Sequence, residues 1–100
     1  MTFLPTDSGG RKAPVASGYR PNHDFGLPGE LNDAQHEYPG VEWVSPGQTV
    51  HALLWLLAPE RQSGRLYPGF TFTIQEGPRV VGNATIVAVS NEALRINRGP

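Results

Sequence analysis

Cysteine is absent from this chain of 100 residues, and its absence excludes several kinds of chemistry at once. Without thiols there can be no disulfide framework, no thiolate metal site and no cysteine nucleophile. A cysteine-free chain is compatible with a reducing compartment, so we expect a cytoplasmic protein. We also expect no secretory signal peptide, because the first residues do not combine a basic start with an apolar core.

A strong charge imbalance and a long apolar run are also lacking. Eight Lys and Arg residues stand against nine Asp and Glu residues, which gives a net charge of −1. General nucleic-acid binders are usually clearly basic. The longest apolar run, residues 52–58, is far shorter than the ~20 residues that cross a bilayer. We therefore expect neither a membrane protein nor a general nucleic-acid binder.

Glycine and proline, in contrast, are abundant, with 12 and 10 residues. Such frequent turn-forming residues favour many short strands over helices. One hundred residues correspond to about one domain. We therefore predict a single all-β domain over residues 1–90, followed by a flexible polar tail over residues 91–100. Small domains of this kind close into a barrel to remove exposed strand edges. The expected fold is a small antiparallel six-stranded closed β-barrel.

Alternating apolar residues give the clearest strand signal, in residues 70–75. Phe70, Phe72 and Ile74 share one face of that strand. A Glu-Gly-Pro-Arg turn then leads into the partner strand, expected over residues 80–89. The most apolar segment, residues 49–57, is also predicted as a strand, and its Trp55 is expected in the core. The remaining expectations are strands at residues 3–4, 19–25 and 41–44, and one helical turn at residues 32–37.

Three motifs share the order and approximate spacing of motifs in a known family. The first is Asp-Ser-Gly-Gly-Arg-Lys-Ala-Pro at residues 7–14 with Gly-Tyr-Arg-Pro at 18–21. The second is Gly-Val-Glu-Trp-Val-Ser-Pro-Gly at residues 40–47. The third is Gly-Phe at 69–70 with Ile-Gln-Glu-Gly-Pro-Arg-Val-Val-Gly at 74–82. Together they resemble the C-terminal (third) β-barrel domain of bacterial elongation factor Tu.

The resemblance implies a translation-related binding module. In that family this domain contacts the T-stem of aminoacyl-tRNA, and Glu76 and Gly77 hold the matching hairpin positions. Asn22 stands where the family carries a Gln near the same surface. The chain lacks a phosphate-binding Gly-x-x-x-x-Gly-Lys-Ser/Thr loop, so no GTP binding is expected. Ala58 replaces a family Lys, and an acid enters the rim segment 27–31; both changes weaken phosphate binding.

We therefore expect a non-catalytic module that most readily binds a protein, with tRNA or other RNA as the alternative ligand. No cofactor is expected. A homodimer is a further hypothesis, because a shortened opening strand leaves one seam of the barrel under-paired. The candidate binding residues are Arg11, Arg20, Asn22, Trp43, Glu76, Gly77 and Arg79.

Several of these residues have a second interpretation. The segment 76–79 is either a recognition tip or a hairpin turn with solvated charges. Arg11, Lys12 and Arg20 form either an anion-binding patch or scattered surface cations. Trp43 is either an exposed hot spot for a partner or a residue that caps the core.

Catalytic and metal sites find little support in the sequence. The histidines show no short metal-binding motif and are expected to be unrelated surface residues. No serine lies in a Gly-x-Ser-x-Gly elbow. The carboxylates Asp33 and Glu37 lie in a polar segment and are expected to serve solubility. The histidines in question are His23, His36 and His51.

Overall fold

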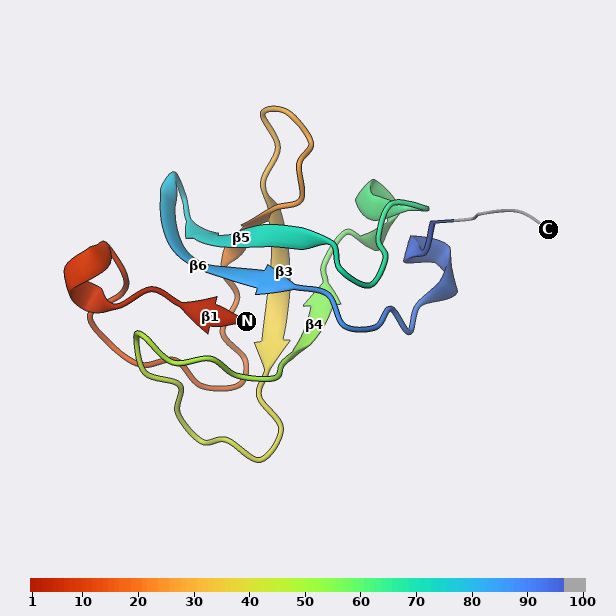
Figure 1. Cartoon of the computed structure of the whole chain (residues 1–100). Coiled ribbons are helices and arrows are strands. Elements are labelled where there is room, and N and C mark those ends of the chain that lie inside the picture. Colours follow the sequence, from red (N-terminus) through yellow and green to blue (C-terminus); the bar gives the residue numbers. More distant parts are fainter. Residues whose placement is uncertain (97–100) are drawn as a thin grey trace.

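Six antiparallel strands form one curled sheet with the shape of a half-barrel in the computed structural model, which describes residues 1–96 (Figure 1). No α-helix occurs among these residues; three short 3-10 turns connect or follow the strands. The strand order across the sheet is β1-β6-β5-β2-β3-β4. The strands are β1 (Thr2–Phe3), β2 (Asn22–Asp24), β3 (Asn32–Glu37), β4 (Leu53–Leu56), β5 (Thr71–Glu76) and β6 (Arg79–Thr85), and the 3-10 turns are η1 (Thr6–Ser8), η2 (Pro59–Gln62) and η3 (Glu92–Leu94).

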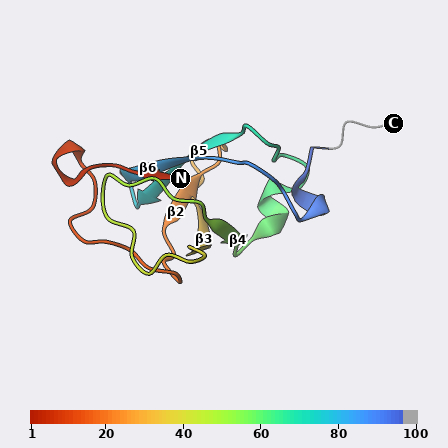
Figure 2. The same ribbon diagram turned by 60° about the horizontal axis from the view of Figure 1, so that its bottom comes forward.

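The sheet curls so that β5 and β6 lie over β3 and β4, and the core fills the space between them. Figure 2 shows β5 and β6 along one side of the molecule and β3 and β4 along the other. The buried apolar residues form two clusters within this space. One contains Phe3, Val15, Tyr38, Val44, Ile74 and Val81, and the other contains Phe25, Leu66, Phe72, Ala84, Val89 and Leu94.

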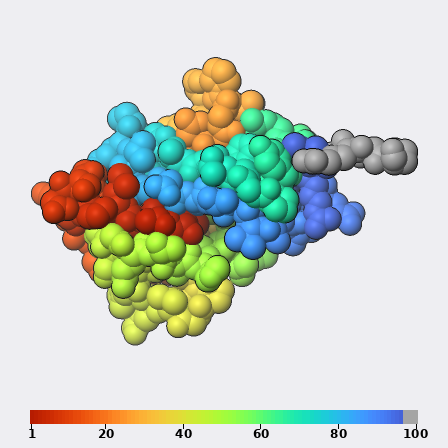
Figure 3. All heavy atoms as spheres, in the orientation of Figure 1, coloured from red at the N-terminus to blue at the C-terminus, as the bar shows by residue number. Residues whose placement is uncertain are grey.

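The short strand β1 connects the two sides of the half-barrel. On one side Thr2 pairs with Asn83 of β6, and on the other it forms a bridge with Thr49. The Val50 amide donates to the Met1 carbonyl over 2.8 Å. The N-terminal residues therefore lie between β6 and the segment that leads into β4, as the red, blue and yellow-green surfaces in Figure 3 show.

The β5–β6 hairpin confirms the alternation seen in the sequence. Phe72 and Ile74 are buried, Thr71 before them is exposed, and Thr73 between them is half-buried. Gly77 in the connecting turn has a φ of +60°, and nothing lies within 4 Å of the position of a β-carbon there. The turn therefore requires glycine for its backbone conformation and not because of crowding. At Gly82 the reverse holds, since a β-carbon would lie 2.8 Å from the Thr2 carbonyl oxygen.

Two of the predicted elements are wrong. Residues 32–37 form strand β3 and not a helical turn, because Asn32, Ala34 and His36 alternate inward and β3 pairs on both edges. Residues 41–44 form no strand, since the only bridge in that segment joins Val44 to Val15. The sequence of β3 is polar, so its strand character comes from its two neighbours and not from its apolar content.

Other elements are shorter than predicted, and one side chain is misplaced. The expected strands 19–25, 49–57 and 80–89 narrow to β2, β4 and β6. Trp55 is 60% exposed instead of buried, because β4 directs Leu54 and Leu56 inward and therefore Trp55 outward.

The chain after residue 90 contributes to the core. Leu94 in η3 is buried, and its carbonyl accepts a hydrogen bond of 2.8 Å from the Leu66 amide. Arg95 donates from Nε to the Val89 carbonyl over 2.7 Å. Residues 91–96 of the predicted flexible tail thus pack against the domain, and residues 97–100 lie outside the described residues.

Replacing Gly82 with Ala should destabilise the protein, because the added methyl group meets the Thr2 carbonyl and the Ile74 side chain. We expect a loss of about 1–3 kcal/mol in the free energy of unfolding, as in other overpacked sites. Urea denaturation of Gly82→Ala and of the exposed control Asn83→Ala measures the difference. Equal midpoints for Gly82→Ala and the wild type would contradict the close approach of β1 to β6.

Candidate functional site

The hairpin tip between β5 and β6 gathers several of the residues predicted from the sequence. Arg11 forms an ion pair with Glu76, and the Tyr19 hydroxyl donates to the same carboxylate oxygen, Oε2, over 2.7 Å. The Arg11 guanidinium also lies over the Tyr19 ring, 4.9 Å from its centroid. Burial and the neighbouring Glu76 carboxylate raise the pKa of Tyr19, so its hydroxyl remains a donor. Glu76 is thus held by two partners instead of being solvated.

Arg79 and Asn22 attach the same tip to other parts of the chain. Arg79 donates from Nε to the Gly9 carbonyl over 3.0 Å and from Nη2 to the Gly10 carbonyl. The Gly77 amide donates to Asn22 Oδ1 over 3.0 Å. The charges and amides of the tip therefore bind the tip to β2 and to the loop after η1. We refer below to the group that these contacts connect, Arg11, Tyr19, Asn22, Glu76, Gly77 and Arg79, as the tip cluster.

Two of the predicted binding residues make no contact with this cluster. Arg20 is exposed and donates from Nε to Gln35 Oε1 over 3.1 Å. Trp43 is 57% exposed, so the interpretation as a core-capping residue is wrong. Arg11 is directed to Glu76 and Arg20 to Gln35, while Lys12 is exposed; the three cations therefore do not act through a shared contact.

Two of the three histidines are buried and bonded to each other, which corrects the prediction of unrelated surface residues. His23 and His36 are both fully buried, and their Nε2 atoms lie 2.8 Å apart. His23 Nδ1 lies 3.0 Å from the Asn32 carbonyl, and His36 Nδ1 lies 2.7 Å from the Tyr38 hydroxyl. Only His51 is exposed.

The Asn32 carbonyl lies at one end of this series of hydrogen bonds and determines the direction of each bond in the series. The Asn32 carbonyl can only accept, so His23 Nδ1 carries a hydrogen. The neutral His23 ring then accepts at Nε2 from His36 Nε2–H, and His36 accepts at Nδ1 from Tyr38. Among residues 1–96 no group of three or more potential metal ligands occurs. With every ring nitrogen bonded, the histidine pair is a hydrogen-bonded part of the core.

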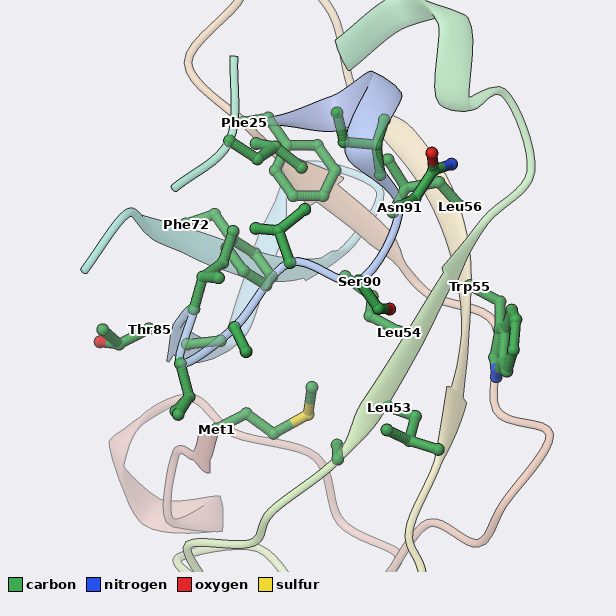
Figure 4. A pocket seen from close by; sticks show the side chains of 18 of the residues that line it. Met1, Phe25, Leu53, Leu54, Trp55, Leu56, Phe72, Thr85, Ser90 and Asn91 are labelled. Carbon is green, nitrogen blue, oxygen red and sulfur yellow. The ribbon is translucent and has the colours of Figure 1, made fainter. Parts of the chain in front are cut away.

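A feature that sequence reasoning missed is an apolar cleft of about 820 Å³ between β4 and the chain that follows β6. Leu54, Leu56 and Phe72 line it, and Met1 lies at one end (Figure 4). Trp55 points away from it (Figure 4). The cleft has no carboxylate, ammonium or guanidinium side chain among its lining residues. The alternation of residues 51–57 was the available signal for the inward-facing residues of one wall. The cleft itself lies between β4 and the chain after β6, which are far apart in the sequence, so no local pattern predicts it.

No protein-family model matches this chain. The likeness to the third domain of elongation factor Tu therefore stays a prediction from the three motifs. Among residues 1–96 no helix is long and apolar enough to cross a membrane.

Acid should destabilise the protein through the histidine pair. Burial lowers the pKa of both rings, and burial together with the neighbouring His23 lowers the pKa of His36 to about 3. Unfolded histidine titrates near ~6.5. Stability is thus present above about pH 6.5 and is lost as the pH falls toward the folded-state values. The loss is at most about 1.4 kcal/mol per pH unit for each histidine.

Urea denaturation at pH 7.5 and pH 5 measures this dependence. The variant His36→Gln should show a flatter dependence than the wild type, whereas the exposed control His51→Gln should keep the wild-type slope. An unfolding free energy that is the same at both pH values in the wild type would contradict the neutral buried pair.

Proposed function

We propose that this chain is a non-catalytic protein-binding module that acts in a translation-related context. The observation that carries the proposal is a row of exposed apolar side chains on the outer face of β4, beside the apolar cleft. Leu53, Trp55 and Leu57 are 52%, 60% and 52% exposed. Contiguous exposed apolar surface of this kind is typical of interaction sites, and Trp is the residue most enriched in binding hot spots.

Charge favours a protein over RNA as the partner. The net charge of the chain is −1, and Arg11 in the tip cluster is already paired with Glu76. The Arg79 guanidinium already donates a hydrogen bond to the Gly9 carbonyl of the same chain. RNA binding at the tip would have to compete with these internal contacts. Binding of a protein to the exposed apolar residues of β4 would break no internal hydrogen bond or ion pair of the tip cluster.

The family relationship and the closed form of the barrel belong to the same proposal. The sheet curls and β1 already pairs with both of its sides, which supports a barrel of the elongation factor Tu C-terminal type. Within this proposal the module works in the cytoplasm and carries no cofactor, and its binding surface lies on and beside β4 rather than in a catalytic pocket. A tRNA-binding module that uses the tip cluster is the second candidate, since Glu76 and Gly77 hold the positions that the resemblance marks.

Photo-crosslinking tests the two candidates against each other. A benzophenone amino acid at position 55 should give protein adducts in cells, and the same amino acid at position 79 should give none above background. Mass spectrometry identifies the adducts, and the expected partners are translation factors. RNA adducts at position 79, with no protein adduct at position 55, would overturn the proposal in favour of RNA.

The salt dependence of tRNA binding supplies an independent measurement. If the module is a protein binder, gel shifts with tRNA should be weak, and joint substitution Glu76→Ala and Arg79→Ala should leave them unchanged. Phosphate-driven binding falls steeply as salt rises. A tight gel shift that weakens with salt and disappears in the double variant would establish the tip cluster as an RNA site.

A further inference from the structure

We propose that the cleft receives an extended segment of a partner protein, which pairs as a β-strand with both walls and completes the barrel. The proposal rests on the protein-binding function argued above, and it adds the site and the conformation of the bound segment. Four observations carry it. Two are the free backbone edges of the two walls of the cleft, one on β4 and one on the chain that follows β6. The third is the position of β1 between these walls, and the fourth is the apolar lining of the cleft.

The first wall is the outer edge of β4. The Leu57 amide donates to the Asp33 carbonyl over 3.1 Å, and Trp55 is paired with Gln35. Hydrogen bonding alternates along an antiparallel strand, so the backbone groups of Leu54 and Leu56 face away from β3. Within residues 1–96 these groups have no backbone partner on that side.

The second wall is the chain that continues β6. The Ile86 amide donates to the Phe70 carbonyl over 2.9 Å, and the Ile86 carbonyl accepts from the Gly69 amide over 2.8 Å. By the same alternation the backbone groups of Thr85, the last residue of β6, face away from β5 and toward the cleft. They too lack a backbone partner in the described part of the chain.

Strand β1 already lies between these two walls and shows how a further strand would fit. Thr2 is opposite Asn83 on one side and Thr49 on the other, antiparallel to both. Continuing this register past Met1 places a strand of six residues opposite residues 51–56 on the first wall and 85–90 on the second. A strand of about six residues, ~20 Å long, would therefore bond to both walls.

The lining of the cleft defines the chemistry of the segment. Side chains opposite Leu54 or Ile86 would point inward, toward Phe25 and Phe72 on the floor. No charged side chain lines this space, and the Met1 ammonium at its end is already bonded to the Val50 carbonyl over 2.7 Å. Barrels of this size are otherwise filled by side chains. The segment should therefore carry apolar residues at alternate positions, while the residues between them point outward and are free to be polar.

Other occupants leave part of the cleft unsatisfied. Within residues 1–96 a second copy offers no free extended segment that could enter the cleft, and edge pairing of two β4 strands would leave Thr85 without a partner. A small apolar molecule would fill the space but leave both backbone edges unpaired. An extended peptide is the occupant that satisfies the apolar interior and the two edges together.

Selection from a displayed library of random ten-residue peptides tests the proposal. We expect enrichment of peptides with apolar residues at alternate positions on the wild-type protein. Enrichment should be lost on Leu54→Lys, which places a charge in the cleft, and kept on Val80→Lys, an exposed apolar control on β6 that does not line the cleft. Circular dichroism of each variant confirms that it is folded.

Amide hydrogen exchange of the wild-type protein with the best selected peptide requires no variant. The amides of Leu54, Leu56 and Thr85 should exchange at least about tenfold more slowly when the peptide is bound. Leu57 and Ile86 are internal controls, because their amides already have partners. A synthetic copy of the peptide with alternate backbone nitrogens methylated, in each of the two registers, should lose this protection in at least one register.

Each other outcome overturns the proposal in a distinct way. Absence of any enriched peptide, or enrichment that Leu54→Lys does not affect, excludes strand addition at the cleft. Peptide binding without protection of the Leu54, Leu56 and Thr85 amides indicates an apolar ligand site instead. Protection that rises with protein concentration alone, together with a dimeric mass, indicates self-association. Protein crosslinks at position 55 without peptide binding would leave the proposed function standing and remove this inference alone.

Discussion

The pairing of β1 with both sides of the sheet is the interaction on which the rest of the structure depends. A strand of two residues bonds to β6 on one edge and to the segment before β4 on the other. These segments are separated by more than 30 residues, so their connection costs loop entropy that a few hydrogen bonds and the burial of Phe3 must offset. The close approach at Gly82 makes this possible, because only a residue without a β-carbon admits the Thr2 carbonyl there.

The second constraint lies inside the core, where the histidine pair joins β2 to β3. Buried polar groups are costly unless they are bonded, and each ring nitrogen of the pair has a partner. A slip of β3 by one residue would turn His36 outward and leave His23 and Tyr38 without their partner. The pair thus specifies the register of a strand whose sequence, Asn-Asp-Ala-Gln-His-Glu, has too few apolar residues to specify it by hydrophobic pattern.

The difference between local patterns and contacts between distant segments explains what could be predicted from the sequence. The β5–β6 hairpin follows from local alternation and a glycine turn, and both are visible in one segment of the chain. Strand β3 and the histidine pair depend on contacts between segments 13 residues apart, so neither leaves a local signal. Trp55 was placed wrongly because the apolar run around it has no polar partner face to show which side is buried. Several residues named from the sequence meet in the tip cluster, but its internal bonds arise from Arg11 and Asn22, which only the fold brings to the hairpin.

The tip cluster and the cleft differ in how their hydrogen-bonding groups are used, and this difference ranks them as binding sites. At the tip, Glu76 and Arg79 already bond to other parts of the chain, so a ligand would gain little by replacing one partner with another. At the cleft, two backbone edges face an apolar space and their groups in residues 1–96 have no protein partner. Water satisfies such groups only while the space stays wet, and apolar side chains favour its removal. A strand that enters the cleft would gain both hydrogen bonds to the free backbone edges and burial of the apolar lining. A ligand at the tip cluster would gain neither without displacing an existing partner.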